Sequence, residues 1–464
     1  MPDEAPSRVA FWSLLALTAA LAAGLHLLNA SGFPAWSSEE SSLFSRALQH
    51  EETGEWYSPG FPYREPFGAT WFVTLLFDFT GPDWDAARLL AGVLAVGDAV
   101  CLYVLATRLS GRPLAGAAAG LAFTLSAPGL VELRRLVLPS FGLFFTLLAA
   151  ALLVSRIPAR VPLAGLAYGL ALYTDVYALA AAPAIGLLLY REVGTRPIPL
   201  AAFGLLFALF GLLWPFRAAL DGEFLEWQEG LRSGMDGPGA EAIARFIGWS
   251  PALVLLGLGG LAYLFVKDRA RALLPAAWLL GAVAVLFLAD PKLKSEALHF
   301  APPFALAAGL FAAHLAVLAT ERASQALMQS EGATPLGLSG EATLHAAVVA
   351  GLVLPMVLGA GGFPTFWSGD ANADLRAAAD FVAANSDPGD TVVAGSVPKA
   401  FIRAEGLKVY DWYRNDLGDK GVRYLVMDDD ARYDLRTWPA LKDLHDASVP
   451  VATFGKYEVR EVAR

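Results

Sequence analysis

WSSEESSLFSRALQHEETGEWYSPGFPYREPFGATW, residues 36–71, is a polar stretch in a part of the chain that is otherwise mostly apolar. Six glutamates crowd it, and Arg46 and Arg64 are its only arginine or lysine residues. Aromatic residues such as Trp36, Trp56 and Tyr63 lie among the acids. A plain connector between two helices needs far fewer residues. A loop of this length and composition therefore indicates a functional segment.

The composition of the whole chain is that of an integral membrane protein. Of its 464 residues, 56% are hydrophobic and only 17% are charged, whereas soluble domains carry about 25% charged residues. Apolar runs of roughly 20 residues recur, which is the length that spans a bilayer. The net charge of −10 argues against a nucleic-acid partner. The single cysteine, Cys101, excludes a disulfide framework.

Eleven apolar runs predict a membrane bundle of α-helices. They are 9–28, 86–108, 113–130, 137–155, 161–174, 176–190, 197–214, 247–266, 271–289, 300–319 and 342–361. The first run is longer than the roughly 7–15 residues of a signal-peptide core, so it is expected to stay as an anchoring helix. The runs on either side of Asp175 are short, and they form either two spans or one long kinked helix.

Short loops rich in arginine and lysine predict the orientation, because such loops stay in the cytoplasm. They lie at 108–112, 156–160, 191–196 and 267–271. They alternate consistently if the N-terminus is cytoplasmic and residues 67–80 do not cross. Those residues are too short for the roughly 17–25 that a span needs, and they are expected to lie on the outer face. The first outer loop is then 29–85.

Residues 363–464 have a different character and are predicted to form a small α/β domain. A helix is expected at 370–385, and short strands are expected at 391–394, 407–410, 422–427, 449–454 and 457–462. The chain therefore divides into a membrane domain, 1–362, and a C-terminal domain, 363–464, outside the membrane. This predicts a multi-pass protein of the plasma membrane whose N-terminus is cytoplasmic.

Two interpretations of Ser37-Ser38-Glu39-Glu40 remain open. Ser37 and Glu40 have the spacing of a capping box, and acids in a first helical turn suit the helix dipole. Alternatively, a carboxylate held at the membrane surface acts as a general base. The residues do not decide between these interpretations, nor whether Glu39 or Glu40 would be the base.

Basic residues on three predicted outer loops indicate an anion-binding face. They are Arg64, the pair Arg134 and Arg135, and the pair Lys292 and Lys294. A lipid phosphate carries its negative charge at the membrane interface, where such cations would bind it and stabilise the charge of its departure. Each cation taken alone is better explained by extension toward the lipid headgroups, whereas basic residues on three loops of one face together favour an anion site.

Together these features resemble the GT-C superfamily of polyprenyl-phosphate-sugar glycosyltransferases, which includes the protein O-mannosyltransferases and the lipid A aminoarabinose transferases. The similar features are the acidic pair Glu39 and Glu40 after the first membrane helix, the proline–glycine–tryptophan helix start at 66–71, and Arg88 at the next span. The resemblance implies a GT-C-like bundle of about 11 spans with an outer domain. It also implies an inverting enzyme, in which a glutamate base assists sugar transfer from a polyprenyl phosphate to an acceptor hydroxyl outside the membrane.

The resemblance also implies which residues form the site. The donor-phosphate-binding residues would be Arg64, Arg88, Arg134, Arg135, Lys292, Lys294 and His299. Candidate substrate-binding residues are Tyr63, Glu65, Trp71 and, from its expected position near the outer face, Asp175. The chain departs from the family at Glu65, where many members have lysine or histidine, and at Ser140, where members usually have an acid.

No Asp-x-Asp pair accompanies the first acids, so the sequence predicts no metal ligands and no required cofactor. A divalent cation is compatible with the site but is not indicated. The expected partners are a polyprenyl-phosphate-linked sugar donor, membrane lipid, and an acceptor glycan, lipid or protein. Two other interpretations remain: a transporter or flippase of lipid-linked sugars, although the repeated halves typical of transporters are not seen, and an inactive scaffold that kept the fold.

Overall fold

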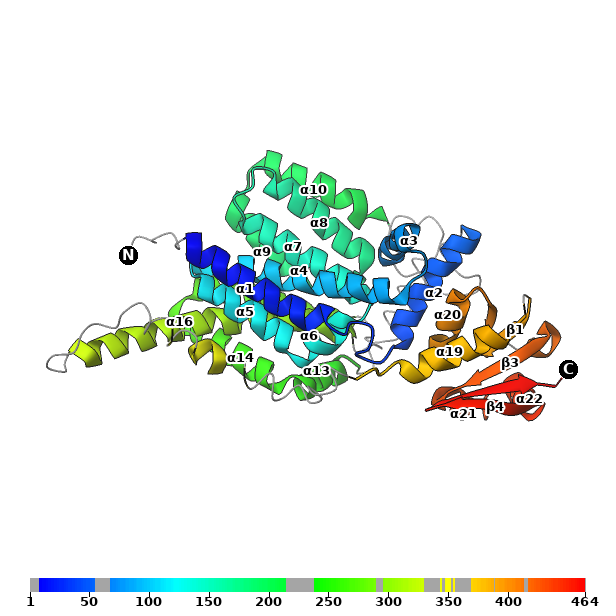
Figure 1. Cartoon of the computed structure of the whole chain (residues 1–464). Helices are drawn as coiled ribbons and strands as arrows, with labels where there is room; N and C mark the ends of the chain where they lie inside the picture. Colours follow the sequence, from blue (N-terminus) through cyan, green and yellow to red (C-terminus); the bar gives the residue numbers. More distant parts are fainter. Residues whose placement is uncertain are drawn as a thin grey trace. The chain divides into compact units, whose positions relative to one another are not determined.

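The computed structural model describes residues 8–54, 67–213, 238–288, 295–328, 343, 347–351, 354, 369–387, 389–412 and 416–463. The described chain is mostly α-helical and ends in a five-stranded sheet (Figure 1). Its contacts separate it into two compact units, which are taken in turn below. The first unit is Met1–Leu28, Phe61–Ala69 and Leu90–Phe363, and the second is Asn29–Gly60, Thr70–Leu89 and Pro364–Arg464. The predicted boundary between residues 362 and 363 places residues 29–85 in the membrane domain, whereas the contacts place most of them in the second unit. The predicted domain division is not tested by this and stays a prediction.

The described secondary-structure elements of the first unit are all helices. Its elements are α1 (Arg8–Leu27), most of α4 (Trp84–Ser110), α5 (Pro113–Leu125), α6 (Ala127–Val131), η1 (Glu132–Arg134), α7 (Leu138–Val154), α8 (Arg160–Thr174), η2 (Val176–Ala181), α9 (Ala182–Val193), α10 (Pro197–Gly211), α13 (Pro238–Trp249), α14 (Pro251–Lys267), α15 (Arg269–Leu288), η3 (Ser295–Phe300) and α16 (Ala301–Met328). Helices occupy every predicted spanning run except 342–361, most of which lies outside the described residues.

Several described helices are long and apolar enough to cross a membrane. Four qualify by length and hydropathy, Arg8–Leu27, Trp84–Ser110, Val176–Val193 and Leu298–Gln325, and two bent helix pairs raise this to six if each pair is one span. Two further apolar helices, α7 and α10, are shorter. These helices are those of an integral membrane protein, and the number of eleven spans stays a prediction.

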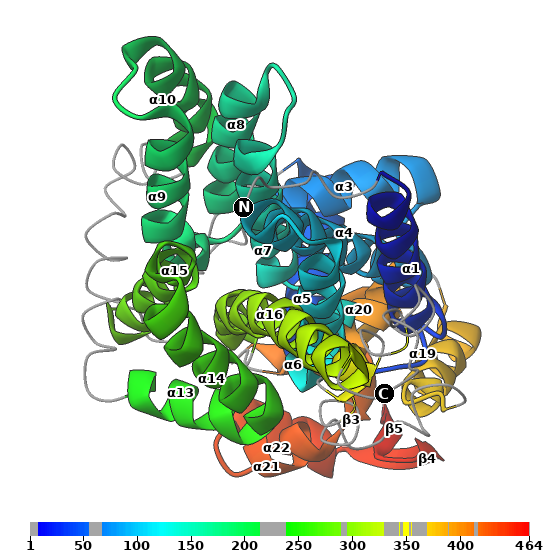
Figure 2. The ribbon, with the colours of Figure 1, turned by 90° about the vertical axis from the view of Figure 1, so that its left-hand side faces the viewer.

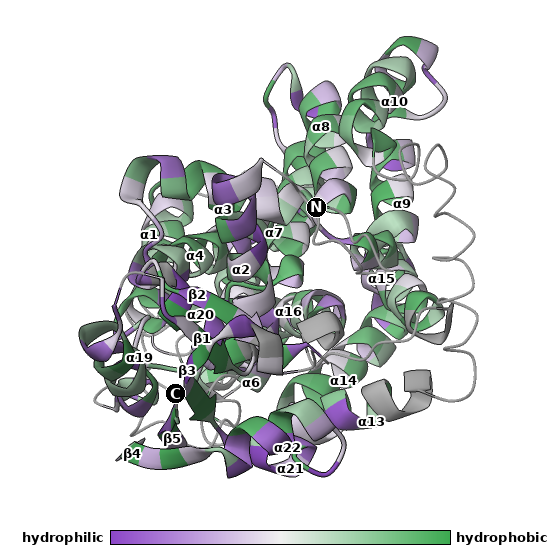
Figure 3. Ribbon diagram, turned by 90° about the vertical axis from the view of Figure 1, so that its right-hand side faces the viewer, coloured by the Kyte–Doolittle hydropathy of each residue, from purple (hydrophilic) through white to green (hydrophobic). Residues whose placement is uncertain are grey.

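The surfaces of these helices are apolar, as contact with lipid requires. Large aliphatic side chains are exposed on α10 (Ile198, Leu205), α14 (Leu255) and α15 (Leu280). Figure 3 shows α8, α9 and α10 as mainly hydrophobic, whereas α21 and α22 of the C-terminal segment carry many hydrophilic residues. Exposed apolar patches of this extent mark membrane or interaction surfaces.

Glycines let neighbouring helices of the first unit approach closely. In α8, Gly165 and Gly169 face α10, where a Cβ on Gly165 would overlap the carbonyl oxygen of Phe203 and one on Gly169 would lie 2.6 Å from that of Phe207. No methyl group fits at such distances, so the glycine-x-x-x-glycine spacing brings the two backbones together. Figure 2 shows α14 and α16 lying side by side in the same unit.

The helical path is interrupted at Asp175. Here α8 ends at Thr174, and the backbone of Asp175 is extended, with φ −154° and ψ 117°. The Asp175 carboxylate then accepts a hydrogen bond from the backbone N–H of Tyr177 at 2.9 Å. It therefore caps the 3-10 helix η2, and the carboxyl group is held at a break between two helical segments.

The second unit combines helices near the first loop with a C-terminal α/β segment. Its elements are α2 (Ser38–Thr53), α3 (Gly68–Thr80, mostly in this unit), the first residues of α4, α19 (Ala373–Asn385), β1 (Thr391–Ala394), α20 (Ser396–Ala404), β2 (Lys408–Asp411), η4 (Leu417–Lys420), β3 (Val422–Met427), α21 (Asp429–Asp434), α22 (Pro439–Asp446), β4 (Ser448–Phe454) and β5 (Tyr457–Val462). The five predicted strands are confirmed to within one residue. The placement of this segment outside the membrane stays a prediction.

The sheet has the strand order β2-β1-β3-β5-β4. Strands β2, β1 and β3 are parallel, whereas β5 runs antiparallel to both β3 and β4. Val392 and Val426 pack with residues of α19 and α20, whereas Val393 and Leu425 pack with residues of α22. Central strands buried on both faces appear as continuous apolar runs in the sequence, which is why these strands were predictable.

Candidate functional site

α2 begins with the predicted capping box. The Ser37 hydroxyl accepts a hydrogen bond from the backbone N–H of Glu40 at 3.3 Å, and the backbone N–H of Ser37 donates to Glu40 Oε2 at 3.1 Å. Two backbone donors that a helix start leaves unpaired are thereby satisfied. The structural interpretation of the motif is thus present, and it involves Glu40.

Glu40 also forms a buried ion pair with Arg88. The Nε and Nη2 atoms of Arg88 donate to the two carboxylate oxygens at 2.6 and 2.8 Å, and both side chains are 0% exposed. Arg88 Nη1 donates to the carbonyl oxygens of Pro34 at 2.8 Å and Ala30 at 3.3 Å. The guanidinium lies 4.3 Å from the centre of the Trp36 ring. All three guanidinium nitrogens are therefore engaged within the protein, as a buried charge requires.

Glu39 lies in the same helical turn but in a different environment. One residue along a helix turns a side chain by about 100°, and Glu39 is partly exposed whereas Glu40 is buried. Glu39 lies in the first turn of α2, where an acidic side chain suits the helix dipole. Glu39 is thus the more exposed carboxylate of the pair.

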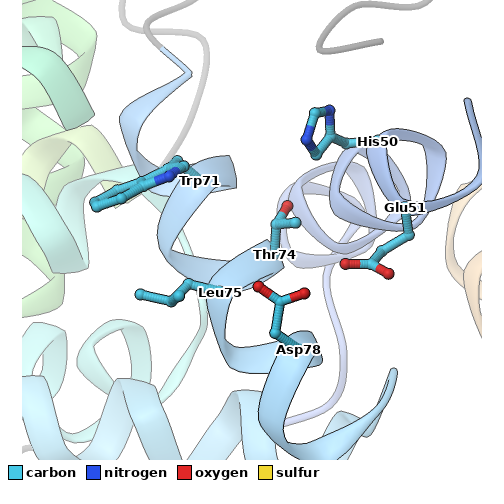
Figure 4. A pocket seen from close by; sticks show the side chains of 6 residues that line it. All are labelled: His50, Glu51, Trp71, Thr74, Leu75 and Asp78. Atoms are coloured by element: carbon cyan, nitrogen blue, oxygen red, sulfur yellow. The ribbon is translucent and has the colours of Figure 1, made fainter. Parts of the chain in front are cut away.

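A cavity of about 320 Å³ lies between α2 and α3 (Figure 4). Its lining residues are His50, Glu51, Trp71, Thr74, Leu75 and Asp78. Figure 4 shows His50 and Glu51 at the end of α2, with Thr74 and Asp78 on the facing part of α3. The sequence singled out Trp71 alone of these six. The helical spacing of residues 71, 74, 75 and 78 is the signal that could have found the α3 members.

Arg134, in the first unit, caps the end of α1. Its side chain is fully buried, and its Nη1 and Nη2 atoms donate to the carbonyl oxygens of Leu25 at 2.6 Å and Leu28 at 2.7 Å. A cation at a helix C-terminus satisfies carbonyls that have no helical partner and suits the helix dipole. These contacts are structural.

Arg135 is more accessible than its neighbour. Its side chain is 19% exposed and pairs with the buried carboxylate of Glu132 at 2.8 Å. The hydroxyl of Ser140, which stands where the similar family has an acid, donates to the carbonyl oxygen of Arg135 at 2.9 Å. Ser140 therefore helps to hold the backbone of this turn.

Asp175 and His299 form a buried pair. Asp175 Oδ2 and His299 Nε2 are 2.7 Å apart, and both side chains are 3% exposed. Gly142 of α7 packs against the carboxyl group, since a Cβ there would lie 2.5 Å from Asp175 Cβ. Among the described residues, no group bonds to His299 Nδ1. A carboxylate bonded to one ring nitrogen fixes the orientation of the imidazole.

Four predicted site residues lie in the first unit, on or next to helical segments that neighbour η3. η3, which carries His299, contacts α6, α7 and η2. Arg134 and Arg135 lie between α6 and α7, and Asp175 directly precedes η2. Glu39, Glu40, Arg88 and Trp71 belong to the second unit. The remaining candidates lie outside the described residues: Tyr63, Arg64, Glu65, Lys292 and Lys294.

The described residues contain no group of three or more histidine, cysteine, aspartate or glutamate side chains that could hold a metal ion. A solved oligosaccharyltransferase structure from Archaeoglobus fulgidus, similar to this chain with a TM-score of 0.55 and 12% identity, is a complex with Zn and sulfate. The match covers 93% of this chain and 71% of the oligosaccharyltransferase chain. The absence of a metal requirement stays a prediction.

Solved structures of other proteins share this fold over nearly the whole chain. ArnT from Cupriavidus metallidurans in the apo state matches with a TM-score of 0.66 and 16% identity over 97% of this chain and 98% of that one. ArnT bound to undecaprenyl phosphate matches with a TM-score of 0.63 and 16% identity, and the match covers 98% of this chain and 97% of the ArnT chain. No protein-family model matches the chain, and no curated protein is similar to it in sequence.

A second group of similar structures comes from an archaeal enzyme. The oligosaccharyltransferase AglB from Archaeoglobus fulgidus, in complex with an inhibitory peptide and a dolichol-phosphate, matches with a TM-score of 0.57 and 12% identity. The match covers 97% of this chain and 74% of AglB. ArnT and AglB are both GT-C superfamily members. The predicted resemblance is therefore confirmed at the level of the fold, along nearly the whole chain.

Proposed function

We propose that the protein is a membrane glycosyltransferase that transfers a sugar from a polyprenyl-phosphate donor to an acceptor hydroxyl. The observation that carries the proposal is the fold shared with ArnT bound to undecaprenyl phosphate, which extends over 98% of this chain. AglB, in its complex with a dolichol-phosphate, supports the same class of donor. The apolar helices, long enough to cross a membrane, are compatible with a lipid-linked donor.

Glu39 is the general base in this proposal. Glu40 is held in the buried pair with Arg88, so accepting a proton there would break a satisfied ion pair. Glu39 is partly exposed at the start of α2. It takes the proton of the acceptor hydroxyl as the hydroxyl oxygen attacks the anomeric carbon. The bond from that carbon to the phosphate oxygen breaks in the same step, and attack from the opposite side inverts the configuration.

The donor phosphate is assigned to Arg135 and His299 of the first unit. Arg135 is partly exposed, and the Nδ1 atom of His299 has no hydrogen-bond partner among the described residues. Both would stabilise the negative charge that grows on the departing phosphate. Arg64, Lys292 and Lys294 are further candidates. Arg88 and Arg134 are given a structural role and not a phosphate-binding role, because their guanidinium groups donate to protein groups.

The reaction is proposed to occur at the outer face of the plasma membrane. Positive charges in the turns at 108–112, 156–160, 191–196 and 267–271 support a cytoplasmic N-terminus, because such loops resist translocation. The first loop and the C-terminal α/β domain are then outside, and the chain crosses the membrane about eleven times.

The proposal is tested by comparing Glu39→Gln with Glu40→Gln in purified protein reconstituted with a labelled polyprenyl-phosphate sugar and native cell-envelope acceptors. Loss of a general base lowers the rate by about 10²–10⁴-fold, so Glu39→Gln is expected to lose transfer while it melts at the wild-type temperature. Glu40→Gln is expected to have a lower melting temperature than the wild type. Transfer that survives in Glu39→Gln would refute the base assignment. Movement of an unaltered donor lipid across vesicles would favour a flippase instead.

A further inference from the structure

We propose that the cavity between α2 and α3 binds a sugar ring of an oligosaccharide acceptor, away from the reacting hydroxyl. This inference rests on the proposed function and adds the class of acceptor to it. The cavity measures about 320 Å³, within the range of about 300–1,000 Å³ of small-molecule sites. All its lining residues belong to the second unit.

Its lining combines the two kinds of group that sugars require. Trp71 is 40% exposed, and its indole offers a flat apolar face for the C–H side of a sugar ring. Glu51 and Asp78 offer carboxylate oxygens that accept hydrogen bonds from sugar hydroxyls, and Thr74 offers a hydroxyl. Figure 4 shows these polar groups turned toward the same space.

The two carboxylates are uncompensated, although acids nearby are paired. Glu52, the next residue in α2, forms an ion pair with Arg403, and Asp85 lies 3.7 Å from Arg376. Within the described part of the chain, neither Glu51 nor Asp78 has an ion-pair or hydrogen-bond partner. Two like charges at one cavity repel each other, and hydroxyl donors from a ligand would relieve that repulsion.

The charge of the cavity separates it from the donor phosphate. Among the described residues that line the cavity there is no lysine or arginine, so these residues offer an anionic phosphate no cation to pair with. A neutral ring with many hydroxyl donors fits this lining. The cavity is therefore assigned to the acceptor and not to the lipid-linked donor.

The geometry of α2 gives the length of the acceptor. His50 is eleven positions after Glu39. Eleven helical steps correspond to a rise of about 17 Å and to a rotation of three turns plus about 20°. The proposed base and the cavity therefore lie on the same face of α2, at opposite ends. A single sugar ring does not reach both places, whereas an oligosaccharide chain does.

Binding to the full-length wild-type protein tests the inference without any turnover. The probes are neutral oligosaccharides of three to six sugars, measured by saturation-transfer NMR with no donor present. At least one probe is expected to bind, and Trp71→Ala and Asp78→Asn are each expected to weaken it by about tenfold. Phe79→Ala is the matched control, because Phe79 is an exposed aromatic of α3 outside the cavity. Failure of every probe to bind, or equal binding by Trp71→Ala, overturns the inference.

Kinetics separate this inference from the proposed function. In the transfer assay, Trp71→Ala is expected to raise KM for an oligosaccharide acceptor by about tenfold and to leave kcat within about twofold, because the residue binds without touching the reacting atoms. A fall in kcat at unchanged KM would overturn the acceptor site. Oligosaccharide binding that persists in a protein without transfer would refute the proposed function while it upholds the cavity as a sugar site.

Discussion

Glu39 and Glu40 are neighbours in sequence, but their surroundings give them different chemistry. Glu40 is fully buried against Arg88, and the arginine also bonds the carbonyl oxygens of Pro34 and Ala30. The capping box was predictable, because it depends on residues three apart. The partner of Glu40 was not predictable, because Arg88 lies 48 residues further along the chain. For the same reason the sequence left open which glutamate would be the base.

Arg88→Met should lower the stability of the protein strongly. It leaves the Glu40 carboxylate buried without its cation, and removing one partner of a buried pair costs about 3–5 kcal/mol. The measurement is the melting temperature of the detergent-purified protein. The double variant Glu40→Gln with Arg88→Met should melt above Arg88→Met alone, because the uncompensated charge is gone. Purely additive losses in the two variants would contradict the ion-pair explanation.

Helices and strands were predictable wherever burial imposes an apolar run. The strands Thr391–Ala394 and Val422–Met427 were predicted at their observed bounds, because both are buried on two faces. In the sequence, the interruption at Asp175 appears as two short apolar runs, which fitted either two spans or one kinked helix. Its cause was hidden, since the Asp175 carboxylate pairs with His299, 124 residues away. Such contacts depend on how α7, η2 and η3 pack.

Gly142→Ala should disrupt the Asp175–His299 pair, because Gly142 lies in α7, which packs against the Asp175 carboxyl group. A Cβ at Gly142 would lie 2.5 Å from Asp175 Cβ and 3.0 Å from the Oδ2 atom that meets His299. Overpacking of this kind costs about 1–3 kcal/mol, so a lower melting temperature and slower sugar transfer are expected. Gly186→Ala in α9 is the matched control, because a Cβ there would meet no atom within 4 Å outside its own helix. A Gly142→Ala protein that transfers sugar as fast as Gly186→Ala would show that the pair has no part in the reaction.

At the scale of the whole molecule, composition alone indicated a membrane protein, and the order of polar loop, helices and outer domain indicated the GT-C class. The structures of ArnT and AglB match the fold along nearly the whole chain. Short arginine-rich turns predict the direction of insertion, but hydropathy and fold say nothing about which side of the membrane each end faces. The orientation therefore needs its own experiment.

Cysteine labelling in intact cells decides the orientation, and the chain suits this method because Cys101 is its single cysteine and is buried. In a Cys101→Ala background, one cysteine replaces Ala159, in the exposed turn after α7, or Asp446, exposed at the end of α22. Because the turn at 156–160 carries two arginines, it should stay in the cytoplasm. A membrane-impermeant maleimide is therefore expected to label Asp446→Cys in intact cells, and Ala159→Cys only after permeabilisation. The reverse pattern would place the C-terminal domain in the cytoplasm and remove the proposed reaction from the outer face.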